Sequence, residues 1–168
     1  SLETDNSDYA VRAQSTAGYA NIRVQFQHKI SGFDFFPTDY AHFEYSSNGG
    51  SSWNTVASWS SNFDWTYRSY TLPAAAEDNP NFRIRLRAQN NSNGDNVWWD
   101  QVVILGDPVQ RTLTINTSGS GSVAKTPNAG TDANGTVVQL TANDAGGWTF
   151  DHWDGDPTGQ ANPKEPHQ

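Results

Sequence analysis

Residues 21–26 read Asn21-Ile22-Arg23-Val24-Gln25-Phe26, a strict alternation of polar and apolar side chains. A later stretch, Phe82-Arg83-Ile84-Arg85-Leu86-Arg87, repeats the pattern. Successive side chains of a β-strand point to opposite faces, so a period of two gathers the apolar residues on one side. Both stretches therefore predict amphipathic strands that have one face on a core and the other in water.

Similar period-two segments recur along the chain between Gly, Asn, Asp and Pro residues, whereas helical periodicity is nearly absent. The expected strands are residues 20–30, 40–46, 55–59, 67–72, 82–88 and 96–105, followed by 112–117, 121–125, 136–142 and 148–153. The polar stretch 46–52 contains Gly49-Gly50 and predicts a hairpin turn. The sequence thus predicts an all-β chain, with an antiparallel β-sandwich (jelly roll) followed by a small β-repeat module.

Composition excludes several classes of protein. The 168 residues carry a formal charge of −8 and show no basic cluster, so we expect no nucleic-acid partner. The longest apolar run, residues 102–105, is far below the roughly 20 residues of a membrane span. There is no cysteine for a disulfide or a thiolate site, and no methionine, so we interpret the chain as an excised or processed piece. We expect a monomer.

The composition changes near Gly106-Asp107-Pro108, where the sequence becomes richer in glycine and poorer in tryptophan. Residues 1–106 are predicted to form the sandwich, and residues 107–168 the small β module. The joint is short because a strand pattern resumes at Thr112.

Three stretches of the first domain resemble a known class of module: residues 39–53, 81–87 and 96–104. They are similar to the MAM-like or carbohydrate-binding jelly-roll modules appended to secreted bacterial glycoside hydrolases, polysaccharide lyases and peptidases. The resemblance implies a jelly roll that binds a ligand. It also implies that the opening strand of the module is missing before Ser1-Leu2-Glu3-Thr4. Trp53 and Trp99 occupy positions that the resemblance assigns to the core, which leaves Trp98 pointing outward.

The second domain has its own resemblance, in residues 113–123, 135–142 and 147–156. These blocks are similar to the divergent internalin-B B-repeat, a small bacterial β module that serves as a spacer or surface contact in exported proteins. The resemblance implies that Trp148 and Trp153 belong to the core of the repeat. It also implies a further strand after Asn162-Pro163, so the repeat is expected to be incomplete at its C-terminus.

Aromatic residues are the most informative candidates for a binding site. Sugar rings stack on exposed aromatic planes, and a rigid ring loses little conformational entropy on binding. Trp59, Trp65 and Tyr67 crowd into the polar stretch 59–67, which we predict to be a loop. With Trp98 they form the predicted carbohydrate-binding set; the alternative is that the loop aromatics cap the end of the sandwich. Similarly, the arginines at 83, 85 and 87 either face an anionic polysaccharide or form a ladder with acids such as Glu44.

Catalytic and metal sites find less support. Glycoside hydrolysis needs two carboxyl groups about 5–10 Å apart, and nothing in the sequence couples any two acids in this way. The histidines show no metal-binding spacing. We expect no cofactor to be required, but a structural calcium ion is a further hypothesis, with Asp95 and Asp100 as candidate ligands and Asp34 and Asp39 as others.

These observations favour a non-catalytic accessory module of a secreted bacterial multidomain enzyme. It would bind polysaccharide and so direct a catalytic domain of the same parent chain to its substrate. The alternative is an adhesion, protein-interaction or spacer module of a secreted protease or surface protein. In both cases we expect the parent protein to be extracellular.

Overall fold

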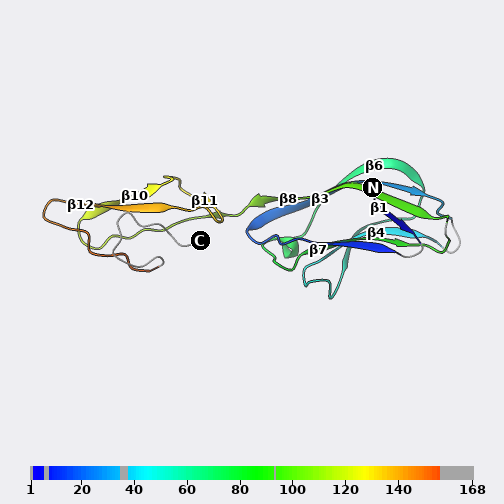
Figure 1. Cartoon of the computed structure of the whole chain (residues 1–168), viewed down its shortest axis with the longest axis horizontal. Helices are drawn as coiled ribbons and strands as arrows, with labels where there is room; N and C mark the ends of the chain where they lie inside the picture. The colour runs from blue at the N-terminus through cyan, green and yellow to red at the C-terminus, as the bar shows by residue number, and fades with distance from the viewer. Residues whose placement is uncertain (1, 6–7, 35–37, 93, 156–168) are drawn as a thin grey trace. The chain divides into compact units, whose positions relative to one another are not determined.

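The computed structural model of the chain describes residues 2–5, 8–34, 38–92 and 94–155. The chain divides into two compact units, Ser1–Asp107 and Pro108–Gln168 (Figure 1). Among the described residues the one helical element is a 3₁₀ turn at Ala74–Ala76. None of the helices in this part of the chain has the length and apolar character needed to cross a membrane. The prediction of an all-β chain is confirmed.

Eight strands build the first unit. They are β1 (Leu2–Asp5), β2 (Tyr9–Ala13), β3 (Tyr19–Ser31), β4 (Tyr40–Ser46), β5 (Asn54–Trp59), β6 (Phe63–Thr71), β7 (Arg83–Gln89) and β8 (Asn96–Pro108). Sheet A has the order β1-β8-β3-β6 and sheet B the order β2-β7-β4-β5. Figure 1 shows the strands of sheet A above β7 and β4 of sheet B.

The chain crosses between the two sheets at every connection except the β4–β5 hairpin, which is the topology of a jelly roll. That hairpin turns through Gly49 and Gly50, both at positive φ, as the sequence predicts. The backbone of β1 pairs antiparallel with β8, from Leu2 opposite Trp99 to Asp5 opposite Asn96. Residues 2–5 therefore form the edge strand of sheet A beside β8.

The alternation in β3 and β7 explains how the sandwich is held together. Ile22, Val24 and Phe26 are buried while their polar neighbours are half-buried on the other side of sheet A. In sheet B, Ile84 and Leu86 are likewise buried, and the arginines that alternate with them are half-buried on the outer side. The inward side chains of both sheets form one apolar core, and each large side chain in it contributes about 1.5–3 kcal/mol of burial free energy.

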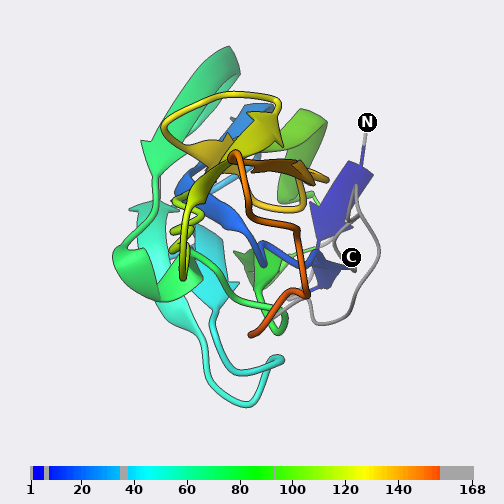
Figure 2. The same cartoon turned by 90° about the vertical axis from the view of Figure 1, so that its left-hand side faces the viewer.

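The second unit has shorter strands: β9 (Gln110–Arg111), β10 (Gly121–Thr126), β11 (Asp132–Ala133) and β12 (Gln139–Asp144). β10 pairs with β12 and β9 with β11, both antiparallel. In Figure 2 this unit faces the viewer, with its strands in yellow to orange. The predictions of strands at 121–125 and 136–142 are confirmed in their main part, but residues 112–117 and 148–153 form no extended strand. Serine and glycine alternate directly after the first of these segments, at residues 118–122, and in the second segment only Trp153 makes a bridge.

Candidate functional site

Three of the four predicted binding aromatics lie on the outer side of sheet A. Trp65 is 43% exposed and Tyr67 is 58% exposed, both on β6. On β8, Trp99 is buried at 1% exposure and its neighbour Trp98 is half-buried on the opposite side. The prediction that Trp99 points inward and Trp98 outward is confirmed. We call Trp65, Tyr67 and Trp98 the aromatic face.

A β-bulge in β6 helps to set the direction of Trp65. His28 of β3 pairs with Thr66, but Ile30, two residues later, pairs with Phe63, three residues away on β6. The extra residue on β6 breaks the strict alternation, and Asp64 and Trp65 are both exposed there. The sequence predicts a loop at 63–66 because this bulge hides the period of two. The structure corrects that prediction, since these residues belong to a strand.

A second irregularity lies in β8 at Asp100 and Gln101. Val97 and Trp99 point into the core, and the next residues packed against it are Val102 and Ile104. One extra residue therefore separates the two inward sets, and Gln101 has a left-handed φ of 51°. The Asp100 carboxylate accepts a hydrogen bond from the Gln101 backbone N–H at 2.8 Å, which supports this bend.

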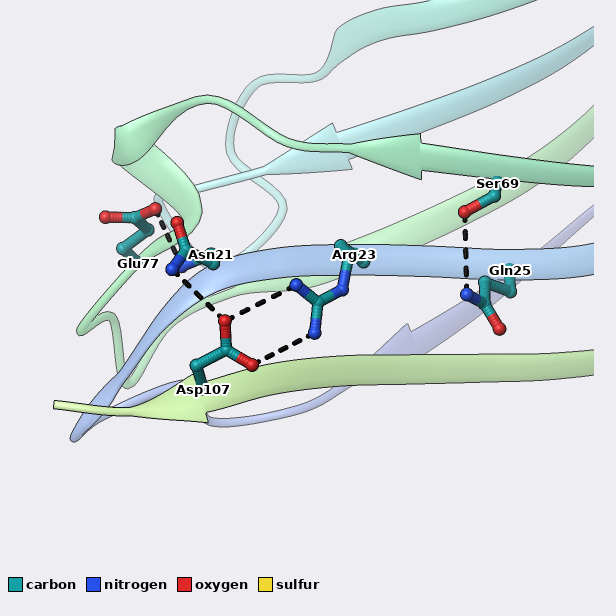
Figure 3. Close-up of polar contacts among 6 residues, drawn as sticks. All are labelled: Asn21, Arg23, Gln25, Ser69, Glu77 and Asp107. Carbon is teal, nitrogen blue, oxygen red and sulfur yellow. Dashed lines mark hydrogen bonds and ion pairs between the residues drawn. The ribbon is translucent and has the colours of Figure 1, made fainter. Parts of the chain in front are cut away.

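Amide side chains lie between the aromatic rings. The Gln27 amide of β3, opposite Tyr67 in the strand register, donates to the Gln101 side-chain oxygen at 3.1 Å. The Gln25 side-chain amide likewise donates to the Ser69 hydroxyl, with 3.5 Å between the nitrogen and the oxygen (Figure 3). The centre of sheet A thus offers both donors and acceptors beside exposed rings, the combination found in sites that bind polar, ring-shaped ligands.

Lys29 connects the two sides of the aromatic face. Its Nζ lies 3.2 Å from a carboxylate oxygen of Asp64 and 5.9 Å from the centre of the Trp98 ring. The Trp65 amide and the Lys29 ammonium both bond the Asp64 carboxylate and lower its pKa. Asp64 is therefore ionised at neutral pH, and its negative charge offsets the positive charge of Lys29.

The far end of sheet A carries a polar cluster. Arg23 donates to both carboxylate oxygens of Asp107, at 3.0 and 3.4 Å, and the Asn21 side chain donates to the same carboxylate at 3.1 Å (Figure 3). The Glu77 carboxylate accepts from the Asn21 backbone amide at 2.9 Å. This cluster ties the end of β8 to β3.

Trp59 does not share this face with the other three. It ends β5 in sheet B and packs against the core, with its ring 4.3 Å from His28, 6.0 Å from Trp99 and 6.2 Å from Phe26. The Arg68 guanidinium lies 5.8 Å from the same ring. In the structure Trp59 therefore closes the space between the sheets, as in the alternative in which the loop aromatics cap the sandwich.

Two of the tryptophans that the resemblances assign to cores lie elsewhere. Trp53 is half-buried, and its ring lies 4.4 Å from the Arg85 guanidinium on the outer side of sheet B. Trp148 is 54% exposed and covers Gly119, where any side chain would collide with the ring. Both predictions treated a large ring as core, but a cation and a bare glycine hold these rings at the surface. Trp153 is half-buried against Phe150, with the ring centres 5.0 Å apart.

The outer side of sheet B carries a group of charged side chains. Glu44 is buried, and its carboxylate accepts from Arg85 Nε at 2.6 Å while Arg87 Nε lies 3.5 Å away. The ladder that the sequence offers as one alternative is therefore present. His42 lies beside Arg87 in the register, and burial together with that cation lowers the pKa of the imidazole. His42 is neutral at pH 7.

The two calcium candidates have different surroundings. Asp95 is 2% exposed, and one of its carboxylate oxygens meets no hydrogen-bond donor among the described residues. Burial raises the pKa of Asp95, and the carboxylates of Asp39 and Asp34 raise it further. Asp100 lies at the β8 bulge. The described part of the chain contains no group of three or more His, Asp or Glu side chains placed to hold a metal ion. Calcium binding stays a prediction.

Sequence reasoning missed several residues that border the two outer faces. The alternation in residues 21–26 predicts a solvent-facing side for β3, but it does not indicate that Gln27 and Lys29 of that strand, or Gln101 of β8, lie beside the exposed rings. Tyr9 at 62% and Tyr40 at 37% exposure lie on the outer side of sheet B. Tyr40 shares strand parity with His42 and Glu44, which was the available signal, whereas Tyr9 shares parity with Val11 and Ala13 and gave none.

Comparison with known protein families finds a match in the second unit. Residues 111–167 match the family model described as the divergent InlB B-repeat domain. The match confirms the resemblance of this segment to a bacterial repeat. It does not extend into the sandwich, so the similarity of residues 1–106 to MAM-like or carbohydrate-binding modules stays a prediction. No curated protein matches the chain.

Proposed function

We propose that the first unit is a non-catalytic module that binds a neutral polysaccharide on the aromatic face. The observation that carries the proposal is the joint exposure of Trp65 and Tyr67 on one strand, with Trp98 two strands away on the same side of the sheet. Exposed aromatic planes on a rigid sheet bind sugar rings through their C–H faces without ordering a loop.

The polar groups around the rings support a sugar ligand. Gln25, Gln27 and Gln101 offer amides that can both donate to and accept from hydroxyl groups. Lys29 and Asp64 neutralise each other, so the centre of the face carries no net charge. This chemistry suits an uncharged hydroxylated polymer better than an ionic ligand.

The biological role that we propose follows from this binding. As an accessory module of a secreted bacterial multidomain enzyme, the unit would hold a catalytic domain of its parent chain close to polysaccharide. The match of residues 111–167 to a bacterial repeat supports a modular parent protein. The same match favours the second candidate, in which the chain is a spacer or protein-contact module and its exposed rings meet protein.

Affinity electrophoresis of the whole chain in gels containing xylan, mixed-linkage β-glucan or hydroxyethylcellulose tests the proposal. We expect at least one of these polymers to retard the wild type. Trp65→Ala and Tyr67→Ala should each weaken binding by about ten-fold, since one aromatic contact contributes up to about 1.5 kcal/mol. Tyr19→Ala is the matched control, because Tyr19 is 45% exposed, close to Trp65 at 43%, but starts β3 at the far end of sheet A.

The outcomes separate the two candidates. Thermal unfolding of Trp65→Ala should stay close to that of the wild type, because this side chain is 43% exposed and does not belong to the apolar core. If none of the polymers retards the wild type, or if Tyr19→Ala weakens binding as much as Trp65→Ala, the proposed function is wrong and the spacer or protein-contact role is favoured.

A further inference from the structure

The outer side of sheet B has more positive charge than its ladder neutralises. Arg83, Arg85 and Arg87 alternate along β7 and share this side, spaced about 7 Å apart as every second residue of a strand. We call these three residues the arginine face. It lies on a chain whose formal charge is −8, so this concentration of cations is local.

The strand register gives the neighbours of each arginine. On β4 they are Ser46 opposite Arg83, Glu44 opposite Arg85 and His42 opposite Arg87; on β2 they are Ala13, Val11 and Tyr9. Glu44 is the one carboxylate among these six positions. Because the lowered pKa of His42 keeps it neutral at pH 7, the three guanidinium groups and one carboxylate leave the face with about two net positive charges.

Arg85 is held rigidly at the centre of the face. Its Nε donates to Glu44, and its guanidinium lies 4.4 Å from the Trp53 ring and 5.7 Å from the Tyr9 ring. Neither Nη atom of Arg85 makes a hydrogen bond within the described residues, and neither is sealed from solvent. A guanidinium fixed in this way loses little entropy when it binds a carboxylate through its free edge.

The flanking arginines also keep free donors. Arg87 Nη1 donates to the Gln89 side-chain oxygen at 3.1 Å, and its Nη2 has no partner in the part of the chain that the structure describes. Arg83 makes neither a hydrogen bond nor an ion pair with any described residue, and its guanidinium lies near the Gly50 turn. Each arginine can therefore offer at least one N–H group to an acidic ligand.

Exposed rings border this row of cations. Tyr9 pairs with Arg87 across the strands and is 62% exposed, and Tyr40 pairs with Gln89 and is 37% exposed. Rings beside guanidinium groups can contact a sugar and its carboxylate at the same time. This combination favours an acidic polysaccharide over an acidic peptide, which would need the charges but not the rings.

We propose that the arginine face binds a polysaccharide that bears carboxylate groups, with its acid groups meeting Arg83, Arg85 and Arg87 and its sugar rings meeting Tyr9 and Tyr40. This site is separate from the aromatic face, and it does not depend on the binding of neutral polymers proposed there.

Titration calorimetry of the whole chain with polygalacturonate tests the site, with fully methyl-esterified polygalacturonate as the uncharged probe. We expect the acid form to bind, and binding to weaken as salt rises from 20 to 300 mM because the contacts are ionic. Arg83→Gln and Arg87→Gln should each reduce affinity by about ten-fold or more, as expected for a charge-assisted hydrogen bond. Arg23→Gln on sheet A is the matched control and should bind as the wild type does.

Each alternative outcome would overturn the proposal. Equal binding of the esterified polymer would mean that the charge is not recognised. Equal binding of poly-glutamate would mean that the face recognises charge alone, and a loss in Arg23→Gln as large as that in Arg83→Gln would mean that the site is not on sheet B. No binding of polygalacturonate would refute the site directly. Trp65→Ala should leave this binding intact, which keeps its result distinct from that of the aromatic face.

Discussion

The two outer faces of the sandwich use tryptophan rings in opposite ways. On sheet A, Trp65 is exposed beside Tyr67, and the polar groups around them are bonded to one another. On sheet B, the half-buried Trp53 ring lies against Arg85, which is itself bound to the buried Glu44. The same architecture can thus place a tryptophan where it supports a folded ion pair on one sheet and where it is free for a ligand on the other.

The largest loss of stability is expected at Glu44, the buried carboxylate on the outer side of sheet B. Glu44→Gln should lower the free energy of unfolding by about 4 kcal/mol, because removing one partner of a buried ion pair leaves the other charge uncompensated. Urea unfolding of the whole chain at pH 7 measures the effect.

The double variant Glu44→Leu/Arg85→Met is the control for Glu44→Gln. Replacing both partners by apolar residues should recover most of the lost stability. If the double variant is as unstable as Glu44→Gln, the cost arises from packing and not from the unpaired charge, and the contrast between the faces disappears.

The interior between the two faces contains a second source of instability, at acid pH. His28 is fully buried, its ring stacks on Trp99 at 5.2 Å, and burial, with the Arg68 charge, lowers the pKa of its imidazole to about 4. The unfolded chain takes up this proton at its ordinary pKa near 6.5, so protonation favours unfolding as the pH falls from 6.5 to 4. From this group we expect a loss of roughly 3 kcal/mol over that window and none above it.

Unfolding free energies at pH 7.5, 5.5 and 4.5 measure this effect. His28→Phe should show a smaller loss at low pH than the wild type, whatever its stability at pH 7.5. His152→Gln, which changes an exposed histidine of the second unit, should keep the trend. If the unfolding free energy of His28→Phe falls between pH 7.5 and 4.5 as steeply as that of the wild type, the acid sensitivity comes from other groups, including those on the two faces.

The smallest effect is expected at the ion pair of sheet A. Asp107→Asn removes a bond to Arg23, but both side chains are exposed, and exposed pairs contribute little. We expect the melting temperature to change by about 2 °C or less, measured by scanning calorimetry. A shift as large as that of Glu44→Gln would show that sheet A depends on its surface charges as sheet B does.

The fold could be predicted where the side chains alternate without interruption. Ile22, Val24 and Phe26 indicated their strand and its buried side, and the hairpin at Gly49-Gly50 followed from turn chemistry. The alternation fails at Asp64-Trp65, where an extra residue enters β6, and a strand there looks like a loop. Bulges of this kind depend on the partner strand, which a local pattern does not contain.

The candidate site was predicted in part for a related reason. Trp98 could be assigned to the outside because its neighbour Trp99 had to point the other way. Trp59 and Trp65 look alike in sequence, each within a polar stretch, yet Trp59 packs against the interior and Trp65 is 43% exposed. Their difference comes from which side of its sheet each ring faces, and for Trp65 this depends on the bulge that forms where β6 pairs with the distant strand β3.

The pairing of β1 with β8 has a consequence for how this unit forms during synthesis. Leu2–Asp5 can complete sheet A only after residues 96–99 are available, so almost the whole sandwich must leave the ribosome before its first strand finds a partner. Contacts between segments so distant in sequence make folding slow. Until β8 has been synthesised and has paired with β3, that edge of β3 is open to strands of other chains. We expect nascent chains that stop before residue 96 to need protection from aggregation, whereas the β4–β5 hairpin, whose strands are adjacent in sequence, can form early.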